Sequence, residues 1–209
     1  DLVRGMYLPS TSFLVTAGII ALMGHLDDRK PVPPIDKMFF QFLCATFVVL
    51  TDPNIRNAMT VKFASNGTFW AIFFLVGLMN AVNFIDGIDG LAALVLFFGS
   101  LGFVLFSWNQ NNAACLTLYC LFLMGMLVPF LHLNVLKRRG FLGNVGSYFL
   151  SYVIGVIHLS LPIDSYGAIS RLALPGLCFL VPIADSCMVI LLRILTRRSP
   201  LHADKGHLH

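Results

Sequence analysis

Long apolar segments, with nearly all charges placed between them, constrain this chain more than any other feature. Only 11% of the 209 residues are charged, whereas soluble domains carry about 25%. A membrane-spanning helix needs roughly 20 apolar residues, within a range of about 17 to 25. Seven segments approach this length: 11–26, 37–51, 68–84, 88–108, 113–133, 145–161 and 172–195.

These segments predict helices rather than strands. In lipid, every backbone polar group needs a partner inside the protein, which leaves helices or a closed barrel. The segments are too long and too uniformly apolar for the alternating strands of a barrel. The sequence therefore predicts an all-α integral membrane protein, a polytopic bundle of about seven transmembrane helices that form one membrane domain over residues 1–209.

Basic residues are divided unequally between the two sides that seven spans would create. The side that holds 27–37, 86–90, 132–144 and 193–209 carries ten lysines and arginines, and the other side carries four. An excess of basic residues marks the cytoplasmic side. We therefore expect an N-terminus outside, a cytoplasmic C-terminus and a multi-pass protein of the inner membrane. The segment 37–51 is short for a span, but this alternation supports it.

Residues 80–90 place two amides and two carboxylates at intervals of three, between two apolar segments. These are Asn80, Asn83, Asp86 and Asp89. Ionisable groups at membrane depth are costly and mark candidate functional sites. On one continuous helix Asn80 and Asp89 would point to opposite sides, and glycines follow both aspartates. We therefore predict that one helix ends near residue 84 and another begins near residue 88.

Two alternatives remain open for these side chains. Asp86 could cap the second of these helices, with Asp89 in its first turn. This explanation does not account for Asn80 and Asn83, which lie in the apolar end of the first helix. A helix N-terminus at this position could also bind phosphate.

A pair of aspartates ends the first apolar segment, in the sequence His25-Leu-Asp-Asp-Arg29. Carboxylates are disfavoured at a helix C-terminus because of its partial negative charge. An ion pair of Asp27 or Asp28 with Arg29 or Lys30 would be a purely structural explanation. A requirement for binding a cation or a polycationic group explains the pair better.

Two further polar stretches lie on the same predicted side. A glycine-rich turn, 140–147, leads into the sixth segment; its Asn144 could cap that helix, or its backbone could let a phosphate approach. The tail 197–209 is basic, as is typical of topology determinants and headgroup contacts. Its residues His207 and His209 could bind a metal, a sugar or a phosphate, or belong to an affinity tag.

Several aspartates, amides, glycine turns and arginines at one membrane face suit a magnesium-diphosphate substrate. Magnesium takes few carboxylates and shares its other positions with phosphate oxygens and water. A lipid substrate would explain why the site lies in a membrane. The alternatives are a transporter or ion channel, whose site usually lies near the midplane between repeated halves, and an alcohol phosphatidyltransferase, whose denser aspartate pattern is not found.

Four ordered motifs resemble one family. They are Asp27-Asp28; Asn80-Ala-Val-Asn83 followed by Asp86-Gly-Ile-Asp89; Phe141-Leu-Gly-Asn-Val-Gly-Ser147; and Arg198-Ser-Pro with His207-Leu-His209. This set resembles the polyprenyl-phosphate N-acetylhexosamine-1-phosphate transferases, of the glycosyltransferase 4 type, over nearly the whole chain. The tail is similar to the N-acetylglucosamine-1-phosphate branch rather than the muramoyl-pentapeptide branch.

The resemblance implies a reaction and its partners. A polyprenyl phosphate, undecaprenyl phosphate in bacteria, attacks the sugar-linked phosphorus of a UDP-N-acetylhexosamine, UMP leaves, and lipid-linked glycan synthesis begins. The implied cofactor is Mg²⁺, with Mn²⁺ as an alternative. Membrane lipid and the two substrates are the expected partners, a homodimer is an open alternative, and no nucleic-acid partner is expected.

The resemblance also implies roles for individual residues. Asp27 and Asp28 match the acidic pair near the lipid phosphate, and Asp27 is the candidate for deprotonating or orienting it. The catalytic set is Asp27, Asp28, Asp86 and Asp89; the substrate-binding set is Asn80, Asn83, Arg198, His207 and His209; and the metal set is Asn83, Asp86 and Asn144.

Two features depart from the family pattern. The family usually has an aspartate, a metal ligand, at the position of Asn144, and an amide oxygen brings no charge. Members also usually have ten or eleven spans, so the seven segments lead us to expect a chain truncated at both ends.

Overall fold

The computed structural model describes residues 9–60, 67–107, 114–137, 140–160, 179, 182–184 and 188. Between residues 9 and 160 of this part, the chain forms seven α-helices and one π-helix, without a β-strand. They are α1 (Thr11–Arg29), α2 (Pro34–Thr51), α3 (Pro53–Thr60), α4 (Gly67–Ile85), α5 (Leu91–Ser107), α6 (Ala114–Leu131), η1 (His132–Leu136) and α7 (Gly143–Leu159).

The all-helical prediction is confirmed for this part of the chain. The first six apolar segments correspond to α1, α2, α4, α5, α6 and α7, whereas most of the seventh lies outside the described residues. Three stretches are long and apolar enough to cross a membrane, namely Pro34–Thr51, Gly67–Ile85 and Leu116–Leu136, and Leu91–Leu105 is a shorter apolar helix. The protein is therefore a membrane protein, and the short second segment is among its candidate spans.

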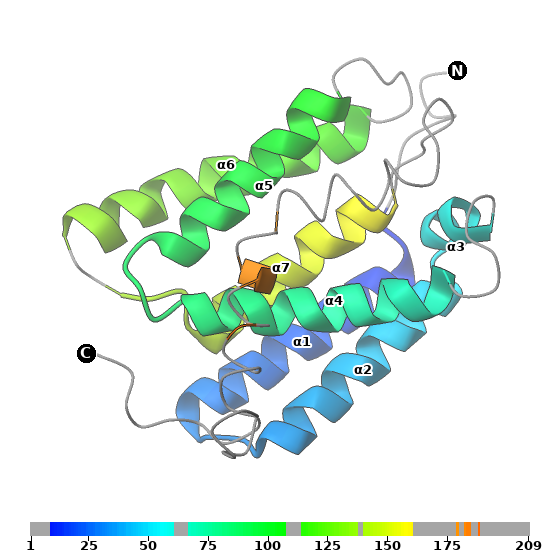
Figure 1. Ribbon diagram of the computed structural model, residues 1–209, viewed down its shortest axis with the longest axis horizontal. Coiled ribbons are helices and arrows are strands. Elements are labelled where there is room, and N and C mark those ends of the chain that lie inside the picture. Colours follow the sequence, from blue (N-terminus) through cyan, green and yellow to red (C-terminus); the bar gives the residue numbers. More distant parts are fainter. Residues whose placement is uncertain are drawn as a thin grey trace.

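The helices form two groups joined through a central pair. Helices α1 and α2 pack together on one side, and α5 and α6 pack together on the other (Figure 1). Helices α4 and α7 lie between these groups and contact each other. Because α1 also packs along α7, the C-terminal end of α1 comes to the N-terminal end of α7.

Two apolar clusters hold this arrangement together, and α4 and α7 contribute to both. One cluster joins α1 and α2 to the central pair and includes Leu75, Met79 and Tyr152. The other joins α5 and α6 to the central pair and includes Leu78 and Ile154. The central helices are therefore fixed from both sides, which positions their ends.

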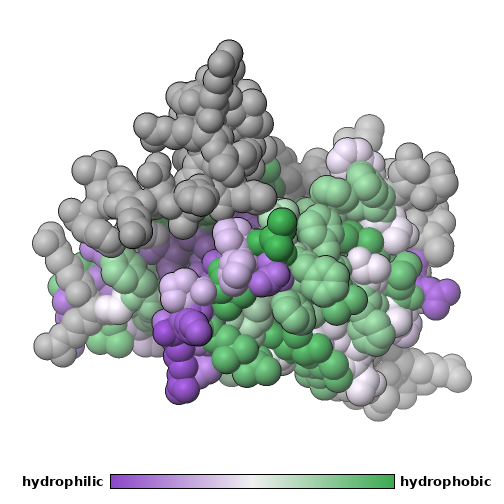
Figure 2. All heavy atoms as spheres, turned by 90° about the horizontal axis from the view of Figure 1, so that it is seen from below, coloured by the Kyte–Doolittle hydropathy of each residue, from purple (hydrophilic) through white to green (hydrophobic). Residues whose placement is uncertain are grey.

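Large apolar side chains also cover the outside of the bundle. Helix α2 exposes Phe39, Phe40, Leu43, Phe47 and Leu50, and hydrophobic residues spread over much of the face in Figure 2. Contiguous apolar surface of this kind is rare on soluble monomers, and a bilayer covers it.

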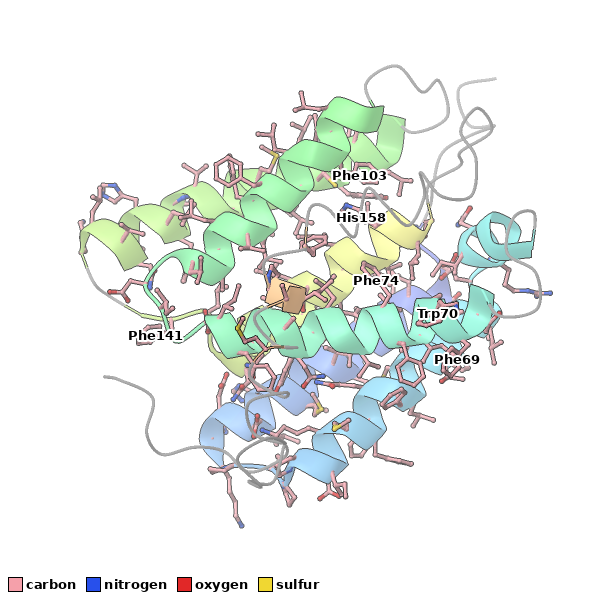
Figure 3. The ribbon with its side chains drawn as sticks, in the orientation of Figure 1. Phe69, Trp70, Phe74, Phe103, Phe141 and His158 are labelled. Carbon is pink, nitrogen blue, oxygen red and sulfur yellow. The ribbon has the colours of Figure 1, made fainter. Side chains whose placement is uncertain are left out.

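Aromatic residues distinguish the outside from the interior. At the start of α4, Phe69 and Trp70 are both more than half exposed, as in the aromatic belts of membrane interfaces (Figure 3). In the interior, His158 of α7 lies beside Phe103 of α5, with ring centroids 5.1 Å apart (Figure 3).

A glycine lets the end of α1 approach the start of α7. A Cβ placed on Gly24 would lie 2.7 Å from the backbone oxygen of Asn144 and 2.7 Å from the Cα of Val145. Those atoms belong to helix backbone, so they cannot move aside as a flexible side chain would. Gly24 therefore allows the close contact that brings Asp28 to α7.

We predict that Gly24→Ala destabilises the protein by about 1–3 kcal/mol, because the added methyl group overpacks this contact. Thermal unfolding in detergent measures the effect. Gly18→Ala is the matched control, since a Cβ at Gly18 of the same helix meets nothing within 4 Å. Equal melting temperatures for the two variants would contradict the prediction.

Candidate functional site

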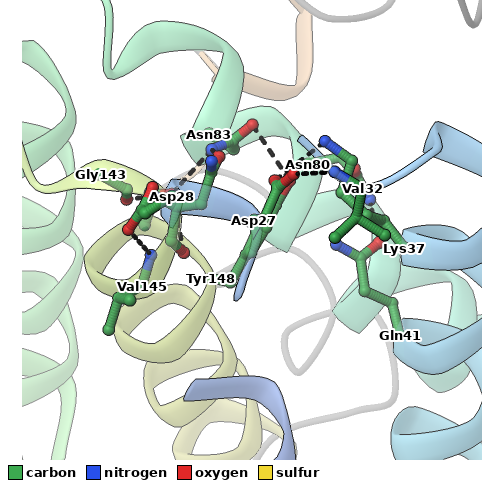
Figure 4. A network of polar contacts seen from close by, with 12 residues as sticks. Asp27, Asp28, Val32, Lys37, Gln41, Asn80, Asn83, Gly143, Val145 and Tyr148 are labelled. Atoms are coloured by element: carbon green, nitrogen blue, oxygen red, sulfur yellow. Dashed lines mark hydrogen bonds and ion pairs between the residues drawn. The ribbon is translucent and has the colours of Figure 1, made fainter. Parts of the chain in front are cut away.

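Four helix ends meet at one end of the bundle and bring their polar side chains together. They are the C-terminal ends of α1 and α4 and the N-terminal ends of α2 and α7. Figure 4 shows the network, with Asp28, Asn83, Gly143 and Val145 on one side and Lys37, Asn80 and Gln41 on the other. We call this set of side chains the helix-end network.

Asp28 crosses from the end of α1 to the start of α7. Its Oδ1 accepts a hydrogen bond from the backbone N–H of Asn144 at 2.8 Å, and its Oδ2 accepts from that of Val145 at 3.2 Å. A carboxylate is favoured at a helix N-terminus, where the dipole is positive. The structure thus explains an aspartate that is unfavourable for its own helix, because it serves another helix.

Asp86 joins the same helix start from the turn after α4. Its Oδ2 accepts from the backbone N–H of Gly143 at 2.9 Å. Gly143 has φ +68°, and a Cβ there would lie 3.0 Å from Asp28 Oδ2, so this position favours glycine on both counts. Two carboxylates therefore hold the first three N–H groups of α7.

This arrangement corrects three sequence-based interpretations. Asp86 serves the start of α7 rather than capping the helix that follows it, and Asn144 lies inside the first turn rather than at the cap. The N–H groups of Gly143, Asn144 and Val145, at the start of α7, bond to Asp28 and Asp86, so these three are not free for a phosphate. The sequence could not show this, because the capping groups come from distant helices.

Burial, with a smaller contribution from the nearby charge of Asp28, raises the pKa of the Asp86 carboxyl to about 6. The backbone N–H groups of Gly143 and Leu142 act in the opposite direction. The ionised form of Asp86 is costly because its carboxylate is partly buried and lies near that of Asp28. A cation bound beside Asp86 would relieve that cost.

Asp27 is buried and has its own partners, on the α2 side. Its Oδ1 accepts from the backbone N–H of Val32 at 2.9 Å, and its Oδ2 pairs with Lys37 Nζ at 2.9 Å. The expected structural alternative, an ion pair with Arg29 or Lys30, is wrong for Asp27, because Lys37 from the next helix takes that place.

Asn83 connects α4 to the first turn of α7. Its Nδ2 donates to Asn144 Oδ1 at 2.7 Å and to Ser147 Oγ at 2.9 Å. The hydroxyl of Tyr148 donates to Asn83 Oδ1 at 3.3 Å. Both amides that were assigned to the metal set therefore touch each other.

Asn80 lies one helical turn before Asn83 and connects α4 to α2. Its Nδ2 donates to Gln41 Oε1 at 2.6 Å and to the backbone oxygen of Val76 at 2.8 Å. Gln41 follows Lys37 by one turn of α2, so the same face of α2 contacts both Asp27 and Asn80.

The structure therefore brings together Asp27, Asp28, Asn80, Asn83, Asp86 and Asn144. Asp89 is exposed and makes no hydrogen bond or ion pair with another described residue. Arg198, His207 and His209 lie outside the described residues.

Four side chains of this network were missed from the sequence: Lys37, Gln41, Ser147 and Tyr148. A signal existed for the first two, because a lysine and a glutamine four residues apart share one side of an otherwise apolar helix. No comparable signal marked Tyr148, which resembles other aromatic residues of apolar segments.

The oxygens present fit a magnesium ion that is shared with a substrate. In the described part of the chain, no three His, Cys, Asp or Glu side chains lie close enough to hold a metal by themselves. Magnesium usually takes one or two carboxylates and completes its shell with phosphate oxygens and water. Asp86 accepts from the backbone of Gly143 at the start of α7, and a carboxylate has further lone pairs that can bind a cation.

We predict that Asp86 makes the free energy of unfolding fall as the pH rises from about 4 to about 6. Its pKa is about 6 in the folded protein and near 3.8 when unfolded, so the unfolded chain loses the proton first in this window. Asp86→Asn should remove this contribution. Unfolding of both proteins in detergent from pH 4 to pH 7 measures it, and a constant difference between them would contradict the raised pKa.

The chain is similar to known membrane transferases. The chain is 28% identical to the probable undecaprenyl-phosphate N-acetylglucosaminyl 1-phosphate transferase of Bacillus subtilis, over all of the chain and 60% of that protein. It is 28% identical to the decaprenyl-phosphate N-acetylglucosaminephosphotransferase of Mycolicibacterium smegmatis, over 94% of the chain and 54% of that protein.

It is 25% identical to the undecaprenyl-phosphate alpha-N-acetylglucosaminyl 1-phosphate transferase of Escherichia coli K12, over 97% of the chain and 58% of that protein. The chain thus spans between 54% and 60% of the length of these relatives. The model of glycosyl transferase family 4 matches residues 10–161, which include all four helix ends of the network. The chain belongs to glycosyl transferase family 4.

Proposed function

We propose that this protein transfers N-acetylglucosamine 1-phosphate, or the 1-phosphate of a closely related N-acetylhexosamine, from a UDP-sugar to a polyprenyl phosphate. The products are UMP and a lipid-diphosphate sugar that starts lipid-linked glycan synthesis. One observation carries the proposal: carboxylates and amides that are distant in sequence meet at one end of a membrane bundle. The names of the relatives support this reaction, and nothing in the described part of the chain favours a transporter or channel.

The paired charges of Asp27 and Lys37 suit the acceptor phosphate. Lys37 Nζ has further N–H groups beyond the one that bonds Asp27, and these can bind phosphate oxygens. Asp27 is held next to that ammonium group, where it can take the phosphate proton or orient the attacking oxygen. Phosphoryl transfer depends chiefly on such positioning and on electrostatics.

The other side of the network suits the nucleotide diphosphate and Mg²⁺. Asp86, Asn83 and Asn144 would hold the ion through carboxylate and amide oxygens, and Asp28 would keep the start of α7 in place for them. When bound, the ion neutralises charge on the transferring phosphoryl group. Mn²⁺ has the same preference for oxygen ligands and is the alternative.

We also propose that the site faces the cytoplasm, with seven spans in the inner membrane. The excess of lysine and arginine on the side of the helix-end network supports this orientation. Arg29, Lys30 and Lys137 are exposed near the ends of α1 and η1 on that side, where anionic headgroups attract them. Arg198, His207 and His209 are proposed to contact the sugar phosphate, and Asp89 the nucleotide.

The test is release of UMP from UDP-N-acetylglucosamine by full-length protein in detergent, with added polyprenyl phosphate and Mg²⁺. We expect Asp27→Asn to lower turnover by about 10²–10⁴-fold, the usual contribution of a general acid or base. Asp36→Asn, an exposed aspartate on the first turn of α2, is the control and should keep full activity. Absence of UMP release from any UDP-sugar would defeat the proposal. Full activity of Asp27→Asn would exclude a catalytic role for Asp27.

A second prediction concerns the amide at position 144. Asn144→Asp should lower the Mg²⁺ concentration that gives half-maximal activity, because a carboxylate adds charge beside Asp86 and can still accept from Asn83. Titration calorimetry with Mg²⁺ in the presence of UDP gives a readout that does not depend on turnover. Asn144→Ser, which brings no charge, should not show the gain. Unchanged affinity in Asn144→Asp would exclude this residue as a ligand.

A further inference from the structure

Gln41 is an exception on the buried face of α2. The other residues of that face are Cys44, Ala45, Val48 and Val49, whereas Gln41 is a polar side chain with 0% exposure. Burying an amide is costly unless it is fully hydrogen-bonded. Its presence therefore calls for an explanation other than packing.

The described residues satisfy only one of the two polar groups of the Gln41 side chain. Its Oε1 accepts from Asn80, but its Nε2 is buried and has no hydrogen-bond partner in the described part of the chain. A buried donor without a partner costs about 1–3 kcal/mol. Among the described residues, Gln41 thus supplies an acceptor for Asn80 but leaves its own donor without a partner, which packing alone does not explain.

The contacts of Asn80 determine which group it offers to the site. An amide nitrogen carries two hydrogens, and those of Asn80 are directed to Gln41 Oε1 and to the backbone oxygen of Val76. Turning the amide over would place its oxygen against the oxygen of Val76. Asn80 therefore has only its Oδ1 left to offer, and this oxygen makes no hydrogen bond to a described residue. Asn80 is partly exposed, whereas Gln41 is fully buried.

We propose that Gln41 is a positioning residue, which holds Asn80 so that its amide oxygen faces the substrate. Asn80 then accepts from an electropositive group, either an N–H or O–H of the nucleotide sugar or the divalent cation that accompanies it. Figure 4 shows Gln41 beside Asn80 on the α2 side of the network. This inference rests on the proposed function, since it assigns a role within the same site.

The variant Gln41→Leu tests the role, because leucine fills the space but cannot accept from Asn80. We expect kcat/KM for UDP-N-acetylglucosamine to fall by about 10- to 100-fold, as when a site group is displaced slightly. The Tm should change little, because removal of the unpartnered Nε2 donor offsets the loss of the acceptor for Asn80. Gln41→Glu keeps an oxygen for Asn80 and should recover at least part of the loss. Ser100→Ala, a buried change on α5 away from the network, should leave activity unchanged.

Separate titrations of the nucleotide sugar and Mg²⁺ identify what Asn80 accepts. A higher KM for the nucleotide sugar alone identifies its N–H or O–H group, and a higher half-saturating Mg²⁺ concentration alone identifies the cation; either result supports the proposal. Unchanged kinetics in Gln41→Leu overturn it, as does a lower Tm with unchanged turnover per folded molecule. An equal loss in Gln41→Glu and Gln41→Leu also overturns it.

The structure of Gln41→Leu separates failure of this inference from failure of the proposed function. If the parent protein releases no UMP, the proposed function fails, and the position of Asn80 decides the role of Gln41. An Asn80 amide that leaves Val76 in the variant supports the positioning role. An Asn80 amide that stays in place overturns it.

Discussion

The carboxylate of Asp28 at the start of α7 is the interaction on which the rest of the site depends. It joins the negative end of one helix to the positive end of another, so that two unfavourable termini become one favourable contact. Asp86 adds a second carboxylate at the same place. With α7 held in this way, Asn144, Ser147 and Tyr148 all reach Asn83 on α4.

Apolar packing and the polar candidate site occupy different parts of the bundle. Away from the helix-end network, α4 and α7 are enclosed by apolar clusters on both sides, which leave these helices little freedom to shift. At the network the side chains become carboxylates and amides, and several are only partly buried. A site that positions two phosphate-bearing reactants needs this combination, because the reacting groups must be accessible while the helices that carry them stay fixed.

Much of this could be predicted from the sequence, because it depends on local patterns. The apolar segments predicted the helices, and the glycines near Asp86 predicted the break between α4 and α5 to within a few residues. The partners of the carboxylates could not be predicted in the same way. Lys37 was counted only among the basic residues of one side, and no role was predicted for Gln41. Their roles depend on which helices pack side by side, which neither spacing nor composition specifies.

The contact between Asp28 and α7 also has a consequence for how the protein is made. Asp28 and its partner Asn144 are separated by 116 positions in the chain, so during synthesis α1 enters the bilayer long before α7 exists. Until then Asp28 and Asp86 lack the backbone partners that α7 provides, and unpaired carboxylates at the lipid boundary are costly. The arrival of α7 thus completes the helix-end network and stabilises the helices made before it.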